Sequence, residues 1–183
     1  LAAYYLKHRF SDDLDFFVFK EPDKIFLHSF TEKLKTIIGA DSFRFERLYD
    51  RNQFFFSFGK EELKVEFTKY PFIQLEETIF KDGIKIDGLR DIAANKLMAI
   101  LDRFEPKDFV DIFFILKEFK LENIVQDVEN KFGIKVGEIF LGGELAKVKR
   151  VEALPRMIKE ITVEELKEFF AKESKKLEPK IFV

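Results

Sequence analysis

Two aspartates at alternate positions are the residues of this 183-residue chain best placed to do chemistry. Asp13 and Asp15 lie at the start of an apolar run, residues 14–19, which predicts a buried strand. Alternate side chains of a strand point to the same face, so we expect the two carboxylates to lie close together. Two such anions repel each other unless a positive charge lies between them. The spacing therefore predicts a site for a divalent cation, Mg²⁺ or Mn²⁺, held through oxygen ligands.

Glu66 is the expected third ligand of that cation. Its segment, residues 61–70, alternates Leu63, Val65 and Phe67 with polar side chains, so Glu66 lies on the polar face of a strand. A carboxylate from a neighbouring strand would complete a site for one or two Mg²⁺ ions, as in two-metal phosphoryl transfer. A structural alternative stays open, because a D-x-D pattern often arises by chance: Asp12 and Asp13 would then end a turn, and Asp15 would be a charge on an edge strand.

Turn residues and apolar periodicity indicate the elements that must position these carboxylates. Pro22 and Asp23 precede apolar residues spaced three and four apart, and Gly39 follows them, which predicts a helix. The next three segments read as strands whose turns, residues 50–52 and Gly59-Lys60, favour antiparallel hairpins. These strands are predicted at residues 42–49, 53–58 and 61–70, and a shorter hairpin at residues 78–80 and 84–86.

The second half of the chain has a helical period. Helices are predicted at residues 91–104, 107–119, 122–131 and 136–148 and, after a linker that contains Pro155, at residues 163–177. The fold class is therefore α+β, with a mixed sheet and flanking helices followed by a C-terminal helical bundle. We expect a sheet core over residues 1–87 and a helical subdomain over residues 88–183.

Composition excludes several classes of function. The chain has no cysteine, which excludes a disulfide framework, a thiolate metal site and a cysteine nucleophile. A net charge of −2 gives no overall attraction for nucleic acid, although a local basic groove stays open. No apolar run reaches the roughly 18 residues of a membrane span, so we expect a cytoplasmic protein without a membrane partner. Abundant Lys and Glu resemble the composition of thermophile proteins.

A second group of charged residues lies in the predicted helices. Lys96 and Arg103 are seven residues apart on one helix face, where both cations could approach phosphate. Asp108 and Asp111, also on one face, are expected to hold these cations by ion pairing. The alternative is an ordinary solvated, salt-bridged helix pair.

Three stretches resemble motifs of a known family. Residues 8–17, His-Arg-Phe-Ser-Asp-Asp-Leu-Asp-Phe-Phe, are similar to the h-R-x-S-x-D-L-D-F-F signature of AbiEii-type toxins (the AbiEii/AbiGii family) of the nucleotidyltransferase superfamily. Residues 91–103 and 107–111 resemble the family motifs D-I-x-x-x-K-x-x-A-x-x-x-R and K-D-x-x-D. Their order and spacing also fit, so the resemblance implies a nucleotidyltransferase-like mixed sheet.

The resemblance also implies an activity. Members are expected to move a nucleoside monophosphate from a nucleoside triphosphate to a hydroxyl of RNA or protein, with Mg²⁺ or Mn²⁺, and to release pyrophosphate. In this chain Asp13 and Asp15 would bind both metals, Glu66 the catalytic metal, and Lys96 the phosphates. Supporting roles in substrate binding would then belong to three further residues, Arg9, Ser11 and Arg103, with Asp108 and Asp111 positioning the cations.

Two features of the family's site, its phosphate-binding turn and its third metal ligand, need comparison with this chain. A Gly-Gly-Ser/Thr turn that grips the phosphates precedes the signature in the family, and we expect it upstream of Leu1. The third metal ligand is more usually Asp in this superfold, and Glu66 is longer by one methylene. The biological role implied is the toxin of a toxin–antitoxin or phage-defence pair, with an antitoxin protein as partner.

Two other functions stay open. A catalytically degenerate nucleotide-binding or protein-interaction module would keep the fold without transfer, and Glu66 in place of Asp is its support. A phosphohydrolase would use the same carboxylates with water as the nucleophile, and would yield free nucleotide instead of a labelled acceptor. His8 and His28 are expected to be surface or packing residues, and the phenylalanines at 54, 55, 56 and 58 to form a packed sheet instead of a base-stacking platform.

Overall fold

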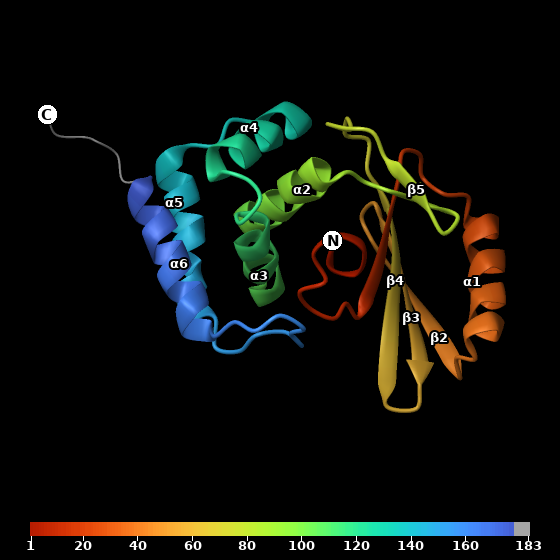
Figure 1. The fold of residues 1–183 in the computed structure, drawn as a ribbon. Helices are drawn as coiled ribbons and strands as arrows, with labels where there is room; N and C mark the ends of the chain where they lie inside the picture. Colours follow the sequence, from red (N-terminus) through yellow and green to blue (C-terminus); the bar gives the residue numbers. More distant parts are fainter. Residues whose placement is uncertain (178–183) are drawn as a thin grey trace, which may run out of the picture. The chain divides into compact units, whose positions relative to one another are not determined.

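The computed structural model of the chain describes residues 1–177 and divides into two compact units (Figure 1). The sheet unit consists of residues 11–72, and the helical unit joins residues 1–10 to the chain from residue 73 onward. The sequence placed residues 1–10 and 73–87 with the sheet, whereas the structure groups both with the helices. Residues 178–183, the end of the expected helical subdomain, lie outside the described residues.

The sheet unit is a four-stranded mixed sheet with one helix. Strand β1 pairs in parallel with β4, and the β4–β3 and β3–β2 pairs are antiparallel, which gives the order β1-β4-β3-β2. This confirms the predicted mixed sheet. The elements of this unit are β1 (Asp13–Val18), α1 (Lys24–Ile38), β2 (Ser42–Leu48), β3 (Arg51–Phe58) and β4 (Glu61–Lys69).

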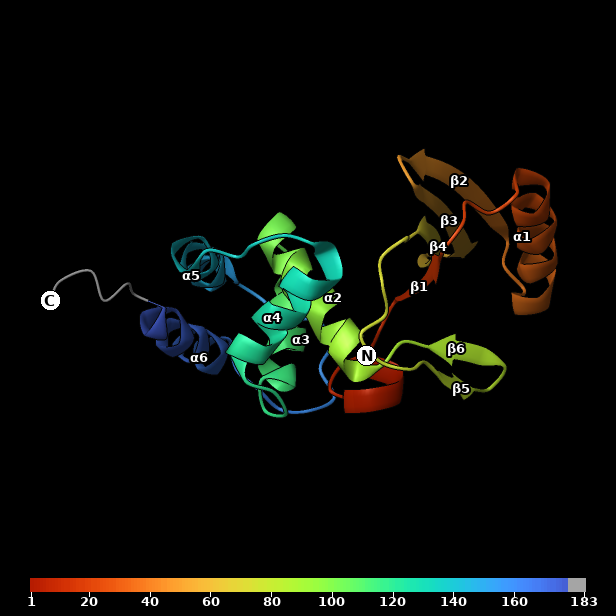
Figure 2. The same cartoon turned by 90° about the horizontal axis from the view of Figure 1, so that it is seen from above.

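Helix α1 covers one face of the sheet, as the view from above shows (Figure 2). Asp23 caps its first turn by accepting hydrogen bonds from two backbone amides, and Gly39 ends it in the left-handed conformation at φ 69°. The apolar core between helix and sheet is largely aromatic, with Phe54 and Phe56 buried. Phe55 points to the opposite face, where the Arg44 guanidinium stacks on its ring.

One strand begins earlier than its sequence pattern suggested. The sequence placed residues 50–52 in a turn, but the turn is made by Tyr49 and Asp50, and β3 starts at Arg51. Tyr49 adopts a positive φ of 53°, as tight hairpin turns between antiparallel strands require. Arg51 is therefore a strand residue and lies opposite Thr68 of β4.

The helical unit packs five α-helices around one apolar core. Helix α2 packs against α3 and α4, and α5 packs against α6. Buried aliphatic and aromatic side chains, among them Leu97, Ile112, Val128 and Phe170, fill the space between them. The elements of this unit are η1 (Ala2–Leu6), β5 (Ile79–Lys81), β6 (Ile84–Ile86), α2 (Leu89–Asp102), α3 (Pro106–Ile115), α4 (Leu121–Phe132), α5 (Glu138–Ala146), η2 (Lys147–Arg150) and α6 (Val163–Lys176).

Backbone hydrogen bonds attach the N-terminal segment to the helical unit. The Phe10 amide donates to the Arg156 carbonyl at 2.9 Å, and the Ile158 amide donates to the His8 carbonyl at 2.8 Å. These bonds explain why residues 1–10 belong with the helices although the sheet follows them directly in the sequence. Along residues 1–177, none of the helices is both long and apolar enough to span a membrane.

Candidate functional site

Strands β1 and β4 bring the three predicted carboxylates to one face of the sheet. The parallel register places Asp13 beside Lys64 and Asp15 beside Glu66. All four side chains point away from the aromatic core, because the alternate residues of these strands pack under α1. Asp13 and Asp15 keep 25% and 48% of their side-chain surface exposed, so solvent and ligands reach both carboxylates.

A lysine ammonium lies among these carboxylates. Lys64 Nζ is 3.7 Å from Asp13 Oδ2, 3.7 Å from Asp15 Oδ1 and 3.3 Å from Glu66 Oε2. This lysine was not singled out in the sequence. Lys64 of β4 reaches the two aspartates of β1 because of the register in which these strands pair. The sequence pattern does not specify that register.

Glu66 is buried and hydrogen-bonded by several side chains. Arg51 donates to it through Nε at 2.5 Å and Nη2 at 2.8 Å, Gln53 donates at 2.8 Å and Thr68 at 2.7 Å. Burial would raise the pKa of Glu66, but the hydrogen bonds from Arg51, Gln53 and Thr68 outweigh it and lower the pKa to about 2. Glu66 is therefore a carboxylate throughout the neutral range.

The donor set at these strands fits a divalent cation in part. Asp13 and Asp15 offer exposed oxygen ligands on one face, as Mg²⁺ requires. Glu66, with Lys64 included, accepts five hydrogen bonds, whereas a carboxylate has about four lone-pair positions. It would have to release a donor before it could bind a metal. Within residues 1–177 no group of three or more His, Cys, Asp or Glu side chains is arranged to hold a metal ion.

Ser11 supports the start of β1 from the polar segment before it. Its hydroxyl donates to the backbone carbonyl of Asp13 at 3.2 Å. Both residues belong to the sheet unit, so this bond is local to the segment that presents the two aspartates. Ser11 itself is exposed.

A second charged cluster lies in the helical unit around Asp111, which is fully buried. Arg9 donates to it through Nε at 2.7 Å and Nη2 at 2.8 Å, and His8 Nε2 and Lys96 Nζ each lie 2.7 Å from it. Burial would raise the pKa of Asp111, but the hydrogen bonds from Arg9 and His8 and the Lys96 charge hold it far below its usual range. The Arg9 motif and the Lys107-Asp108 motif thus meet at one carboxylate.

Lys96 bridges the two aspartates of α3, as the sequence predicted. Its ammonium lies 2.9 Å from Asp108 and 2.7 Å from Asp111, and Asp108 also pairs with Arg103 at 3.1 Å. Burial would lower the pKa of Lys96, but the two carboxylates outweigh it and raise the pKa. Lys96 and Arg103 keep 22% and 42% of their side chains exposed, whereas Arg9 keeps only 9%.

The sequence did not predict how deeply two polar groups of this unit, His8 and Asp91, are buried. His8 is fully buried, packs its ring 4.9 Å from that of Phe114 and leaves Nδ1 without a hydrogen-bond partner in the described structure. Asp91, the first residue of its motif, accepts bonds from the backbone amides of Leu75 and Glu76 and from Lys131. The packing alternative for His8 is confirmed, and Asp91 anchors the segment before β5. His28 is exposed on α1.

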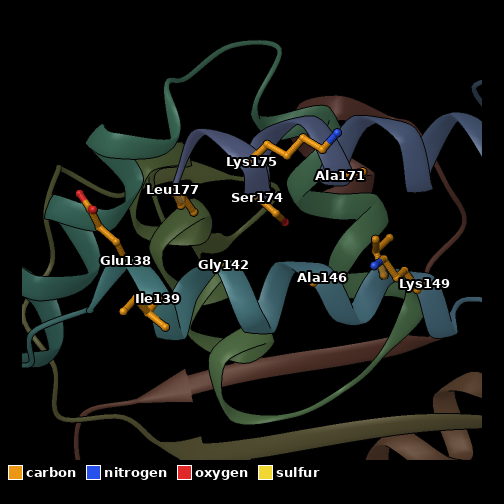
Figure 3. A pocket seen from close by; sticks show the side chains of 10 residues that line it. Glu138, Ile139, Gly142, Ala146, Lys149, Ala171, Ser174, Lys175 and Leu177 are labelled. Carbon is orange, nitrogen blue, oxygen red and sulfur yellow. The ribbon is translucent and has the colours of Figure 1, made fainter. Parts of the chain in front are cut away.

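Two pockets of the structure lie away from these charged clusters. One, of about 420 Å³, lies between α5 and α6, and Figure 3 shows Gly142 and Ala146 of α5 lining it together with Ala171 and Ser174 of α6. The other, of about 300 Å³, lies in the sheet unit on the α1 face, between α1 and strands β2 and β3. The aspartates of β1 are on the opposite face of that sheet.

A family model matches the chain almost from end to end. The family described as "Nucleotidyl transferase AbiEii toxin, Type IV TA system" matches residues 1–180. An uncharacterized protein of Aquifex aeolicus is 31% identical over 129 residues, which make up 68% of this chain and 59% of that protein. The chain thus spans less than two thirds of the length of this relative.

Two solved structures from Helicobacter pylori share the fold. One, described as a candidate nucleotidyltransferase, has a TM-score of 0.56 and 22% identity and covers 97% of this chain and 84% of its own. The other, JHP933, has a TM-score of 0.53 and 23% identity and covers 96% and 80%. At these identities the similarity shows the fold alone.

Replacing Asp111 with alanine is expected to lower the free energy of unfolding by about 3 to 5 kcal/mol, because buried cations lose their counter-charge. Urea unfolding followed by circular dichroism measures the loss. Asp102→Ala, at the exposed end of α2, is the matched control and should change stability by less than about 0.5 kcal/mol. Equal losses in the two variants would contradict a stabilising role for the cluster.

The lowered pKa of Glu66 predicts a pH-dependent contribution to stability. A carboxyl whose pKa is lowered on folding stabilises the fold above its ordinary pKa of 4.5 and loses this contribution as the pH falls toward about 2. The difference in unfolding free energy between wild type and Glu66→Gln should therefore shrink across this window, by at most about 3 kcal/mol. Glu62→Gln, on the same strand but half-exposed, is the control. A difference that stays constant across the window contradicts the prediction.

Proposed function

The chain belongs to the AbiEii nucleotidyl transferase toxin family, and we propose that it is an enzyme that transfers a nucleoside monophosphate from a nucleoside triphosphate to a hydroxyl of RNA or protein. The observation that carries the proposal is the pair Asp13 and Asp15, at alternate positions of β1 and both at least partly exposed on one face of the sheet. Two anions in this arrangement are suited to the oxygen-ligated cation on which phosphoryl transfer depends.

In this mechanism Asp13 and Asp15 would hold Mg²⁺ or Mn²⁺. When bound, the ion would neutralise charge on the triphosphate and position the attacking hydroxyl. Ser11 keeps the first residue of the pair in place through the Asp13 carbonyl, while β4 supports β1 by parallel pairing. The transfer forms a bond from the acceptor oxygen to the α-phosphorus and breaks the bond to pyrophosphate, which leaves.

Lys96 and Arg103 remain the residues that we propose for phosphate binding, from the family motif of residues 91–103. Lys96 and Arg103 are partly exposed, and Asp108 and Asp111 fix their positions. An ion-paired lysine with a raised pKa keeps its charge at neutral pH, as phosphate binding requires. Arg9, expected to bind substrate, instead donates to Asp111 through the Nε and Nη2 of its guanidinium, so its contribution would be to position that carboxylate.

The biological role proposed is that of a toxin held in check by an antitoxin protein. This rests on the family, whose description includes a type IV toxin–antitoxin system. We place its action in the cytoplasm, where nucleoside triphosphates and RNA or protein acceptors are available.

A second candidate function is a nucleotide-binding or protein-interaction module without transfer activity. The saturated hydrogen bonding of Glu66 favours it, because a three-carboxylate metal site would need one of its donors to move away. Asp13 and Asp15 favour the enzyme, because both carboxylates keep surface that solvent and ligands can reach.

Calorimetric titration of the full-length protein with each nucleoside triphosphate, in Mg²⁺ or Mn²⁺, tests the proposal. Asp13→Asn/Asp15→Asn is expected to weaken metal-dependent binding by at least roughly tenfold, because two anionic ligands are lost. Asp12→Asn, which removes an exposed charge from the same segment, should bind like the wild type.

The products separate the remaining functions. Pyrophosphate together with a labelled acceptor identifies transfer, and free nucleotide identifies a phosphohydrolase. Metal-dependent binding without either product supports the non-catalytic module. Failure of the folded, intact protein to bind any nucleoside triphosphate contradicts the enzymatic proposal.

A further inference from the structure

Lys64 stands out on this face of the sheet because its ammonium lies near the carboxylates of Asp13, Asp15 and Glu66. Its ammonium lies 3.7 Å from oxygens of both Asp13 and Asp15 and 3.3 Å from Glu66. The side chain is 20% exposed, so this position is partly shielded from solvent.

Electrostatics explains why a cation is needed at this position. Asp13 and Asp15 lie on the same face of one strand, and their mutual repulsion favours any arrangement that places positive charge between them. The Arg51 guanidinium binds Glu66 through two nitrogen atoms. Lys64 lies within ion-pair distance of both aspartates.

Glu66 holds the lysine in this position. Its carboxylate is 4% exposed and fixed on three sides by Arg51, Gln53 and Thr68, so it is a rigid acceptor for the Lys64 ammonium. A lysine side chain is long and flexible, and a fixed anion at its end selects one of its many conformations. In this arrangement Arg51 fixes the Glu66 carboxylate, and Glu66 in turn positions the Lys64 ammonium.

We propose that Lys64 is a tethered counter-ion of Asp13 and Asp15, positioned by Glu66 and displaced when a divalent cation binds the two aspartates. The inference rests on the proposed function, since it takes the aspartates as the metal ligands. The ammonium and the metal compete for the same oxygens, so Lys64 weakens metal binding. Its displacement frees one positive charge on the face where the metal and its triphosphate bind.

Binding of Mn²⁺ without nucleotide tests the competition, with free Mn²⁺ measured by electron paramagnetic resonance. Lys64→Met is expected to bind Mn²⁺ roughly two- to tenfold more tightly than the wild type, because the ion no longer has to displace an ammonium. Lys64→Arg, which keeps the charge, should not show this gain. Lys60→Met is the matched control: Lys60 lies exposed in the turn between β3 and β4 and has no ion pair in the described structure, so its loss should leave the affinity unchanged.

Thermal unfolding gives a second readout that does not depend on activity. In the presence of a chelator, Lys64→Met should unfold at a lower temperature than the wild type, because Asp13 and Asp15 then lose the Lys64 charge that offsets their mutual repulsion. Saturating Mn²⁺ should raise its unfolding temperature by more than it raises that of the wild type. Lys64→Gln, which is polar and uncharged, provides the same comparison if the methionine variant does not fold.

Asp13→Asn/Asp15→Asn separates this inference from the proposed function. If this variant loses Mn²⁺ binding while Lys64→Met binds no more tightly than the wild type, the counter-ion role is overturned and the aspartate site stands. If Mn²⁺ binding survives in the double variant, or no variant binds Mn²⁺, the aspartate site itself fails and the inference fails with it.

Glu66→Gln distinguishes a positioning residue from a metal ligand. As a positioning residue Glu66 can be replaced while Mn²⁺ affinity stays within roughly threefold of the wild type, because the aspartates remain. A loss of Mn²⁺ binding as complete as that of the double aspartate variant would identify Glu66 as a ligand and overturn the role proposed for it here.

Discussion

Burying a carboxylate removes the hydration of its charge, and both units of this chain are organised around acids that recover this loss through fixed donors. In the sheet unit Glu66 is held by Arg51 and its neighbours, and in the helical unit Asp111 is held by Arg9, His8 and Lys96. The network of the helical unit joins segments that are distant in the chain, since His8 and Asp111 are 103 residues apart, whereas Arg51 lies 15 residues from Glu66. Since an unpaired charge at either position would be costly, these networks fix which segments of the chain meet.

The exposed acids behave differently from the buried ones, and that contrast defines the site. Asp13 and Asp15 remain open to solvent and are compensated by a flexible lysine, whereas Glu66, on the neighbouring strand, is saturated by donors. A ligand can therefore displace the Lys64 ammonium from the aspartates at a lower free-energy cost than it can displace the donors of Glu66. Differences in burial between adjacent strands thus assign different roles to three carboxylates that look equivalent in the sequence.

Local periodicity was sufficient to predict which charged side chains share one face of a strand or helix. The shared face of Asp13 and Asp15 follows from the two-residue repeat of a strand, and the pairing of Lys96 with the α3 aspartates was expected from helical spacing. The partners of Glu66 were not predictable in this way, because Arg51 had been placed in a turn and the register of β3 against β4 sets its reach. Nor does any local pattern reveal that His8 and Arg9 bind Asp111 or that residues 1–10 join the helical unit.

The order of segments has a consequence for synthesis on the ribosome. The sheet unit is continuous in sequence, so all of its strands are available once residue 72 has emerged. The segment before it must wait much longer, because its partners are Asp111 and the backbone around Met157. The order of translation therefore favours pairing of the sheet strands well before residues 1–10 are anchored. A ribosome stalled before residue 111 would hold a chain that contains every strand of the sheet unit but lacks Asp111, the partner of Arg9.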